Sequence, residues 1–259
     1  MTDRPVPLRF LKVDTLSVEV HGRREEMGRA AALDVAVRMR ELLRTQPLVR
    51  MVFAAAASQN EFLATLAGQD NVDWARVEAF HMDEYIGLPE GAPQSFARFL
   101  RERLFDLVCP GRVVYIDGRA ADPEAEARRY ATRLAERPID IVCAGIGENG
   151  HMAFNDPHVA DFSDPATVKI VTLDDVCRAQ QVHDGAFDRL DLVPRTALTL
   201  TMPTLMSARA LYCIVPGPSK TAAVHRTLRG PIAEECPATI MRRHARAILY
   251  LDATSAADV

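Results

Sequence analysis

The most constraining feature of the chain is an apolar, β-branched run that ends in glycine. Residues 139–144 read Ile-Asp-Ile-Val-Cys-Ala, and Gly-Ile-Gly-Glu-Asn-Gly follows at 145–150. A short apolar run bounded by turn residues is typical of a strand buried on both faces of a sheet. Glycine lets the backbone approach a ligand closely, and ligands of open α/β sheets bind where the strands end. The run therefore predicts a central strand whose carboxyl end opens into a binding loop.

Similar apolar runs recur along the chain and alternate with amphipathic segments. Strands are expected at 50–56, 76–81, 112–116, 139–145, 197–201, 210–216 and 245–252, and helices at 23–46, 60–66, 94–107, 123–136, 174–187 and 219–228. Such alternation predicts a mostly parallel sheet with helices on both faces. We expect residues 1–259 to form a single α/β domain with three layers around an open, twisted sheet.

Composition and charge exclude several classes of partner. The net charge is −4, with acids and bases interspersed, so nothing favours nucleic acid or an anionic membrane. No run of about 18 apolar residues could span a bilayer, and the N-terminal residues lack the apolar core of a signal peptide. Five scattered cysteines without a C-x-x-C pair are typical of reduced thiols. We expect a cytoplasmic protein that acts on a small molecule.

The segment 145–150 also matches the G-x-G-x-x-G fingerprint of dinucleotide-binding folds. That fingerprint opens directly into a helix and usually belongs to the first βαβ unit of a domain. Here it lies in the middle of the chain, and Phe-Asn-Asp-Pro at 154–157 would soon end a helix. The sequence therefore predicts no nicotinamide or flavin site and no organic cofactor.

His151 follows the glycine turn, and Asp156 lies five residues later. A carboxylate that accepts a hydrogen bond from one imidazole nitrogen fixes the tautomer and stabilises the imidazolium. In a loop at a strand end, we interpret the pair as a proton-transferring histidine and its orienting acid rather than as a buried structural histidine. A metal bound by His151, Asp156 and His158 would match no standard zinc spacing, so no metal is expected.

Two other strand ends carry charged residues. Asp83 and Glu84 end the strand predicted at 76–81; alone, they are as typical of a solvated turn as of an active site. Lys220 lies in the first turn of a predicted helix, where a cation opposes the helix dipole unless an anion is bound. Because the carboxyl ends of parallel strands meet at one edge, we expect both segments to share a site with His151.

Together these segments resemble the glucosamine-6-phosphate deaminase/isomerase family, whose relatives include the 6-phosphogluconolactonases. The resemblance extends from about Phe53 to Asp252. The block MDEYIGLP (82–89) resembles the family signature around its proton-transfer aspartate. The block GIGENGHMAFNDP (145–157) resembles the signature around its ring-opening histidine. Two long motifs in this order are far more specific than either alone, and they imply a modified Rossmann-like fold.

The resemblance implies a role for each matching residue. Asp83 corresponds to the proton-shuttling aspartate and His151 to the catalytic histidine. Asp156 stands where the orienting acid is usually glutamate, and Asn149 stands where aspartate is common. Asparagine accepts a hydrogen bond but brings no charge to stabilise an imidazolium. The substrate-binding residues implied are Ser58, Glu84, Arg178 and Lys220, of which Ser58, Arg178 and Lys220 would bind phosphate.

One loop departs from the family. Members usually carry a glycine-containing Thr-Gly-Ser/Gly-Thr-Pro loop after the first strand, whereas residues 54–60 here read Ala-Ala-Ala-Ala-Ser-Gln-Asn. Ser58, Gln59 and the N-terminus of the following helix could still bind an anion. The sequence therefore leaves the exact sugar phosphate open.

The implied reaction converts glucosamine 6-phosphate and water into fructose 6-phosphate and ammonia, without a metal or an organic cofactor. Three alternatives stay open: a 6-phosphogluconolactonase-type hydrolase, an isomerase of another sugar phosphate, and a non-catalytic sugar-phosphate sensor. The block around Asp83 and the residues after His151 favour the isomerase over the lactonase, and their presence favours catalysis over sensing. The resemblance allows a homo-oligomer, and the poor match at 158–169 predicts no allosteric site.

Overall fold

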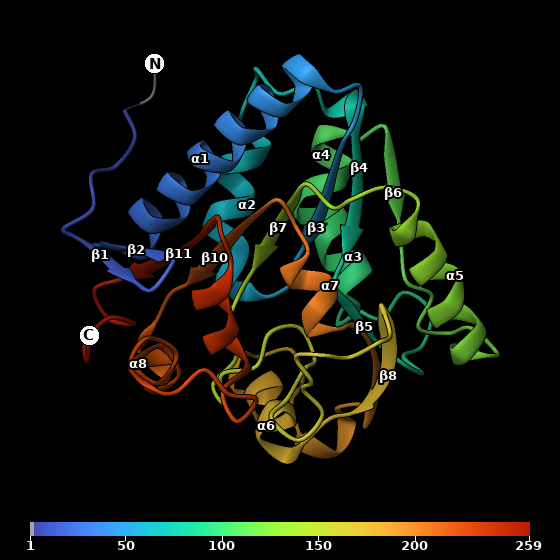
Figure 1. Ribbon diagram of the computed structural model, residues 1–259. Helices are drawn as coiled ribbons and strands as arrows, with labels where there is room; N and C mark the ends of the chain where they lie inside the picture. The colour runs from blue at the N-terminus through green and yellow to red at the C-terminus, as the bar shows by residue number, and fades with distance from the viewer. Residues whose placement is uncertain (1–2) are drawn as a thin grey trace.

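Two sheets form the framework of the protein, which the computed structural model describes over residues 3–259 (Figure 1). The strands of the larger sheet are β1 (Arg9–Val13), β2 (Leu16–His21), β3 (Val49–Phe53), β4 (Val77–His81), β6 (Arg112–Val114), β7 (Ile141–Ala144), β10 (Ala210–Val215) and β11 (Ala247–Asp252). They lie in the order β1-β2-β11-β10-β7-β3-β4-β6. Only β1 and β2 pair antiparallel; the other neighbours are parallel.

The smaller sheet is antiparallel and lies beside the lower end of the larger one in Figure 1. Its strands are β5 (Asp83–Tyr85), β8 (Val168–Thr172) and β9 (Thr196–Leu200), in the order β5-β9-β8. Only one residue, Met82, separates β5 from the end of β4. The two sheets therefore meet where the central strands of the larger sheet end.

Helices cover both faces of the larger sheet. They are α1 (Arg24–Thr45), α2 (Asn60–Ala67), α3 (Phe96–Leu100), α4 (Asp106–Val108), α5 (Pro123–Ala135), α6 (Asp175–His183), α7 (Met202–Met206) and α8 (Thr221–Arg229). Successive side chains of β7 enter opposite cores. Ile141 and Cys143 pack with α1, α2 and the 96–108 segment, whereas Val142 and Ala144 pack with α5, α7 and α8. Burial on both faces explains why the sequence of this strand is an almost continuous apolar run.

The predicted three-layer, mostly parallel α/β architecture is confirmed. Three details differ. The predicted helix at 94–107 is interrupted, because a π-helical turn at Arg101–Phe105 separates α3 from α4. The predicted strand at 197–201 belongs to the smaller, antiparallel sheet. The hairpin β1–β2 was not predicted. A short buried run looks alike in parallel and antiparallel sheets, so its sequence does not reveal its partner. The single domain over residues 1–259 stays a prediction.

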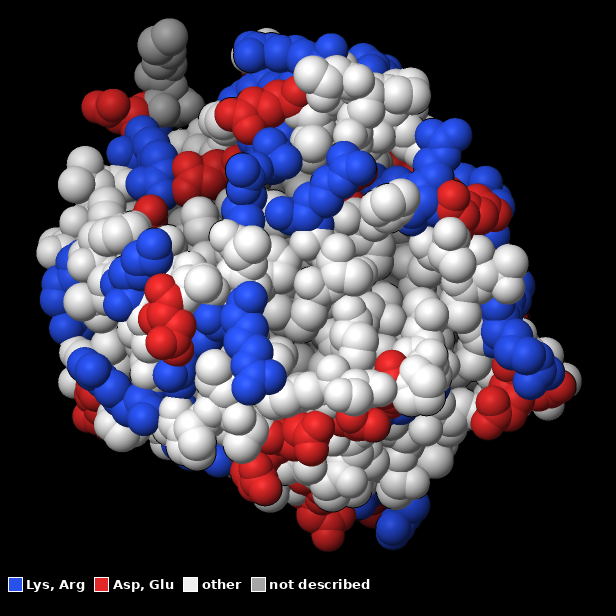
Figure 2. Space-filling model, viewed as in Figure 1, with Lys and Arg blue, Asp and Glu red and all other residues white. Residues whose placement is uncertain are grey.

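The visible surface carries charges of both signs. Figure 2 shows acidic and basic side chains intermixed over one face of the molecule, without an extended area of one sign. Within residues 3–259, no helix combines the length and the apolar character needed to cross a bilayer.

A buried arginine holds the amino ends of the central strands together. Arg50, near the start of β3, is 1% exposed, and its Nε lies 2.7 Å from Oε2 of Glu78 on β4. Its guanidinium carbon lies 4.8 Å from the centroid of the Phe80 ring. The guanidinium also donates hydrogen bonds to main-chain carbonyls at the end of α5, those of Arg133, Leu134 and Arg137. Carbonyls at a helix end lack partners within the helix, so Arg50 pairs a buried acid and caps α5 at once.

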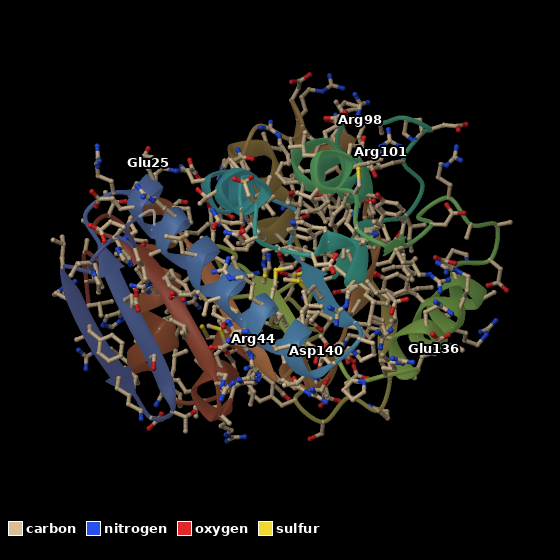
Figure 3. The ribbon with its side chains drawn as sticks, turned by 90° about the horizontal axis from the view of Figure 1, so that it is seen from above. Glu25, Arg44, Arg98, Arg101, Glu136 and Asp140 are labelled. Carbon is tan, nitrogen blue, oxygen red and sulfur yellow. The ribbon has the colours of Figure 1, made fainter. Side chains whose placement is uncertain are left out.

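Asp140 extends this arrangement to β7. Its Oδ2 accepts hydrogen bonds from the main-chain N–H of Arg50 and from Nε2 of Gln46, both at 2.9 Å. Its Oδ1 lies 3.2 Å from the guanidinium of Arg209. Figure 3 shows Asp140 on the same side of the molecule as Arg44, at the end of α1, and Glu136, at the end of α5. The buried charges at this edge are therefore paired within the protein.

We expect Arg50→Met to lower the free energy of unfolding by about 3 kcal/mol or more, because Glu78 loses its buried partner and α5 loses its cap. Denaturant unfolding measures this. Arg209→Met is the control: Arg209 is half exposed, so its loss should cost about 1 kcal/mol or less. Equal stability of the two variants would contradict this account.

Candidate active site

A cavity of about 510 Å³ opens at the carboxyl edge of the larger sheet. Its walls come from the segments that follow four strands: 54–60 after β3, Met82 and Asp83 after β4, 145–154 after β7, and Lys220 after β10. Residues of the 93–103 segment and of 180–188 complete it. The strand ends identified from the sequence therefore converge on one space.

The predicted site residues divide into three groups. Ser58, Asp83, His151 and Lys220 line the cavity. Asn149 and Asp156 lie behind His151 and contact its ring. Glu84 and Arg178 do not line the cavity, and their side chains are engaged elsewhere.

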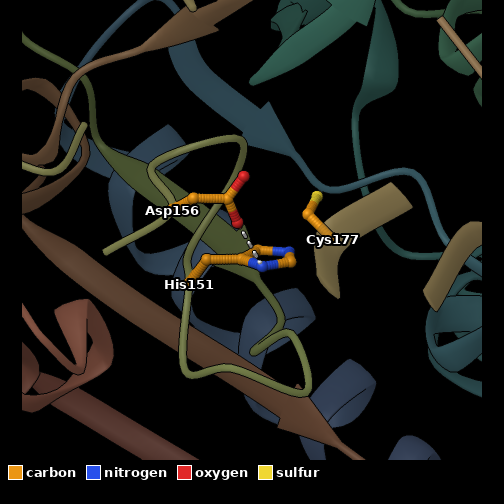
Figure 4. A group of neighbouring side chains, drawn as sticks. All are labelled: His151, Asp156 and Cys177. Atoms are coloured by element: carbon orange, nitrogen blue, oxygen red, sulfur yellow. Dashed lines mark ion pairs between the residues drawn. The ribbon is translucent and has the colours of Figure 1, made fainter. Parts of the chain in front are cut away.

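The imidazole of His151 is held at one nitrogen by two oxygens. Its Nδ1 lies 2.7 Å from Oδ1 of Asn149. The same nitrogen lies 3.0 Å from Oδ1 of Asp156 (Figure 4). Nδ2 of Asn149 donates to the same Asp156 oxygen at 3.0 Å. Two acceptors at Nδ1 select the tautomer that carries its proton there. Nε2 then keeps its lone pair and has no hydrogen-bond partner within residues 3–259.

Asp156 is fully buried and remains suited to the ionised form. Burial opposes its ionisation, but the hydrogen bond and the charge of His151 act in the other direction. The donors on Asn149 and on the main chain of Asp174 add to this effect. Together they hold the pKa of Asp156 below its usual value. The side chain of Asp156, one methylene shorter than that of glutamate, reaches the ring.

The glycine turn makes room for the ring of His151. A Cβ atom at Gly147 would lie 2.1–2.4 Å from atoms of the His151 ring, so the main chain of residue 147 packs directly on the imidazole. Gly150 has φ +92°, a conformation that favours glycine. No helix follows at 151–157. The turn therefore differs from a dinucleotide-binding loop, which opens into a helix.

Asp83 offers an unpaired carboxyl. It opens β5, is 7% exposed, and its side chain has no hydrogen-bond partner in the part of the chain that the structure describes. Burial, followed by the nearby charge of Glu84, raises its pKa well above the usual value. A carboxyl with a raised pKa in a cavity is suited to exchange protons with a ligand.

His81, which the sequence analysis did not single out, holds the main chain of Asp83. Its Nδ1 donates to the carbonyl oxygen of Asp83 at 2.8 Å, and its Nε2 accepts from the main-chain N–H of Ile116 at 2.9 Å. Complete burial lowers the pKa of His81 to about 4, so it is neutral at neutral pH. It acts as a fixed hydrogen-bonding link between β4 and β5.

Glu84 caps a helix instead of facing the cavity. Its carboxylate accepts hydrogen bonds from the main-chain N–H groups of Tyr85, Phe96 and Ala97 at 3.0–3.2 Å and from Oγ of Ser95 at 2.8 Å. These donors include the free N–H groups at the start of α3. Glu84 therefore does not line the cavity, and its role in substrate binding stays a prediction. Adjacent residues of a strand point to opposite sides, which separates Glu84 from Asp83.

Arg178 is likewise engaged within the protein. It is buried on α6, where its guanidinium contacts Oδ1 of Asp175 at 3.0 Å and the carbonyl oxygens of Leu190 and Val193 at 2.6 and 3.2 Å. It ties α6 to the turn before β9, and the predicted contact with phosphate has no counterpart in the cavity wall.

Lys220 and Ser58 provide features of an anion site. Lys220 is 5% exposed, and its ammonium has no hydrogen-bond partner within residues 3–259. Burial lowers its pKa, while the carboxylates of Asp184 and Glu148 act to raise it. Ser58 lies in the 3₁₀ turn before α2, where its Oγ accepts from Nε2 of Gln59 at 3.1 Å. A buried unpaired ammonium is expensive in free energy unless an anion binds.

An aromatic cluster joins three walls of the cavity. The ring of Tyr85 lies 4.9 Å from that of Phe96, 5.2 Å from that of Phe154 and 5.5 Å from that of Phe187, measured between centroids. Phe96 belongs to α3, Phe154 to the loop of His151, and Phe187 to the segment after α6. Nothing in the sequence pattern indicates that these four rings meet.

His151 and Asp156 also lie near a thiol. Their ligand atoms and Sγ of Cys177 lie within 4.8 Å of one another (Figure 4), a group of the kind that binds zinc. A cation there would have to replace the proton that Nδ1 of His151 shares with Asn149 and Asp156. The absence of a metal cofactor stays a prediction.

Comparison with known proteins identifies the family of the chain. A family model described as "Glucosamine-6-phosphate isomerases/6-phosphogluconolactonase" matches residues 22–250. A glucosamine-6-phosphate deaminase of Arthrobacter sp. is 33% identical over 224 residues, 84% of each chain. That of Halothermothrix orenii is 30% identical over 235 residues, 89% of this chain and 95% of the other.

Solved structures share the fold. A monomeric glucosamine-6-phosphate deaminase matches with a TM-score of 0.84 and 28% identity over 93% of this chain and 98% of the other. A 6-phosphogluconolactonase from Thermotoga maritima matches with a TM-score of 0.72 over 92% and 98%, and at 20% identity this likeness concerns the fold alone. The chain belongs to the family of glucosamine-6-phosphate isomerases and 6-phosphogluconolactonases.

Proposed function

We propose that the protein converts glucosamine 6-phosphate and water into fructose 6-phosphate and ammonia. One observation carries this proposal: the carboxyl of Asp83 and Nε2 of His151 line the same cavity, and neither has a hydrogen-bond partner within residues 3–259. Relatives that match most of this chain bear the name of that activity. We assign the reaction to the cytoplasm, because five scattered, unpaired cysteines are typical of that compartment.

Binding would begin at the phosphate. The ammonium of Lys220 supplies charge, and the hydroxyl of Ser58, with the main-chain N–H groups at the start of α2, supplies hydrogen-bond donors. A grip on this remote group positions the carbons that react.

His151 would then open the sugar ring. Its Nε2 accepts the proton of the anomeric hydroxyl and delivers it to the ring oxygen as the bond between C1 and that oxygen breaks. Asp156 stabilises the imidazolium formed between these transfers, and Asn149 keeps the ring in place. Because Asn149 is neutral, the negative charge beside the ring comes from Asp156 alone among these two residues.

Asp83 would carry out the isomerisation. As a carboxylate it takes the proton from C2 while a proton of the substrate's ammonium group passes to O1, which gives an enolamine, and it then returns its proton to C1. The resulting ketimine at C2 is hydrolysed by water to fructose 6-phosphate and ammonia. Burial makes the carboxylate a stronger base, because it destabilises the negative charge. Hydrolysis of 6-phosphogluconolactone involves no proton transfer at C2, so it would use such a base only to activate water.

The test of the proposal is ammonia release from glucosamine 6-phosphate by the purified protein, with fructose 6-phosphate measured in parallel. Equal amounts of the two products are expected. Hydrolysis of 6-phosphogluconolactone without ammonia release would contradict the proposal in favour of the lactonase. Binding without turnover would contradict it in favour of a sensor.

Replacing Asp83 with asparagine should lower kcat by about 10³-fold, because the amide cannot accept the C2 proton. Binding of fructose 6-phosphate, measured by calorimetry, should change little. The control is Glu84→Gln, which removes a neighbouring charge but leaves an oxygen to cap α3. Near-normal turnover of the Asp83 variant would remove Asp83 from the mechanism.

The same substitution should stabilise the protein at neutral pH. The pKa of Asp83 is raised in the folded protein, so folding favours its protonated form. This contribution is fully present below the unfolded pKa of about 3.9 and is lost as pH rises through the folded pKa. Asp83→Asn should therefore melt at a higher temperature than wild type at pH 7, and the difference should shrink towards pH 4. A variant that melts lower at pH 7 would refute this.

Lys220→Met should raise KM for glucosamine 6-phosphate by about tenfold or more, because a charge-assisted contact to phosphate is lost. We expect a smaller effect on kcat. An unchanged KM would show that Lys220 does not contact the phosphate.

A further inference from the structure

A sugar 6-phosphate brings about two negative charges, and the described residues of the cavity wall include two cations, Lys220 and Arg103. Three acids, Asp83, Asp184 and Asp188, line the same space. Lys220 alone therefore faces an excess of negative charge once substrate binds. Arg178 does not line the cavity, so Arg103 is the second cation of its wall.

Arg103 belongs to a stripe of side chains that faces the cavity. Phe96, Phe99 and Arg103 are three and four residues apart, which puts them on one side of a helical segment, and all three line the cavity. The guanidinium carbon of Arg103 lies 5.7 Å from the centroid of the Phe99 ring. A cation held over an aromatic ring keeps its orientation while its N–H groups stay free.

The neighbouring arginines of this segment are paired, whereas Arg103 is not. Nε of Arg98 lies 2.6 Å from Oε1 of Glu102, and Nε of Arg101 lies 3.6 Å from Oδ2 of Asp106. Figure 3 shows Arg98 and Arg101 at the outer side of the molecule. Arg103 has neither an ion pair nor a hydrogen-bond partner among residues 3–259. Its side chain is exposed, so the donors of the guanidinium are in contact with solvent and free to bind a ligand at the rim of the cavity.

The segment also packs against α2, the helix that follows the turn of Ser58. The π-helical turn that carries Arg103 contacts α2, and the turn at the start of α2 carries Ser58. Residues 54–60 of that turn contain no glycine. A guanidinium donates two parallel hydrogen bonds to a phosphate, so Arg103 adds charged donors to those of Ser58 and of the start of α2.

We infer that Arg103 binds the phosphate of the substrate together with Lys220, and that it sets the preference for phosphorylated over unphosphorylated sugars. This inference rests on the proposed function for the identity of the sugar. The arginine contributes binding and positioning, and takes no part in proton transfer.

The test compares Arg103→Met and Arg103→Lys with Arg101→Met, a control from the same segment whose side chain points outward. Calorimetry with fructose 6-phosphate and competition by inorganic phosphate report binding without turnover. We expect the Kd for fructose 6-phosphate and KM for glucosamine 6-phosphate to rise about tenfold in Arg103→Met. The rise should be smaller in Arg103→Lys and absent in Arg101→Met, with kcat changed much less than KM in all three.

The outcomes separate this inference from the proposed function. Unchanged binding in Arg103→Met, in a protein that releases ammonia, would overturn the role of Arg103 alone. Weakened binding in a protein that releases no ammonia would support the role of Arg103 and overturn the deaminase. A fall in kcat at constant KM would overturn the inference, because it would indicate a role in the chemical step. Equal weakening of fructose and fructose 6-phosphate binding would also overturn it, since the contact would then be to the sugar.

Discussion

The structure depends on the buried guanidinium of Arg50. Strands β3, β4 and β7 start at the same edge, and each brings a charged side chain there: Arg50, Glu78 and Asp140. Removing such charges from water is costly unless they pair, and here each finds its partner within the protein. The same guanidinium donates hydrogen bonds to carbonyl oxygens at the end of α5, so it connects the central strands to one of the helices that cover the sheet. These contacts join β7, β3 and β4, which are neighbours in the sheet.

The opposite edge of the sheet has the reverse arrangement. Asp83 and Lys220 are nearly as buried as Arg50, yet neither side chain has a partner within residues 3–259. Unpaired buried charges destabilise a fold, and such strain is common at functional sites. The paired charges at the amino edge of the sheet stabilise the fold and offset the cost of the unpaired charges at the carboxyl edge. Because the charged groups at the cavity edge have no partners within the described protein, they are available to an ionic substrate.

Part of the site could be predicted from the sequence because it depends on local geometry. The run before Gly145 determined the strand, and the glycines that follow bring His151 and Asp156 into contact. Glu84 and Arg178 could not be assigned in this way. Their partners, the start of α3 and the turn at 190–193, lie in segments distant along the chain. The pairing of the smaller sheet and the position of Arg103 in the cavity wall also depend on tertiary packing. A sequence pattern with the period of a strand or a helix therefore does not reveal them.

The ring cluster around Tyr85 has a consequence for how the cavity admits its ligand. Tyr85 touches α3, the loop of His151 and the segment after α6 through closely packed rings. Packed interiors transmit a displacement instead of absorbing it. None of these walls can swing outward alone, as a hinged lid would, without disturbing the other two. The ring packing therefore couples the positions of α3, the loop of His151 and the segment after α6, so a shift of one wall is passed on to the loop that carries the histidine.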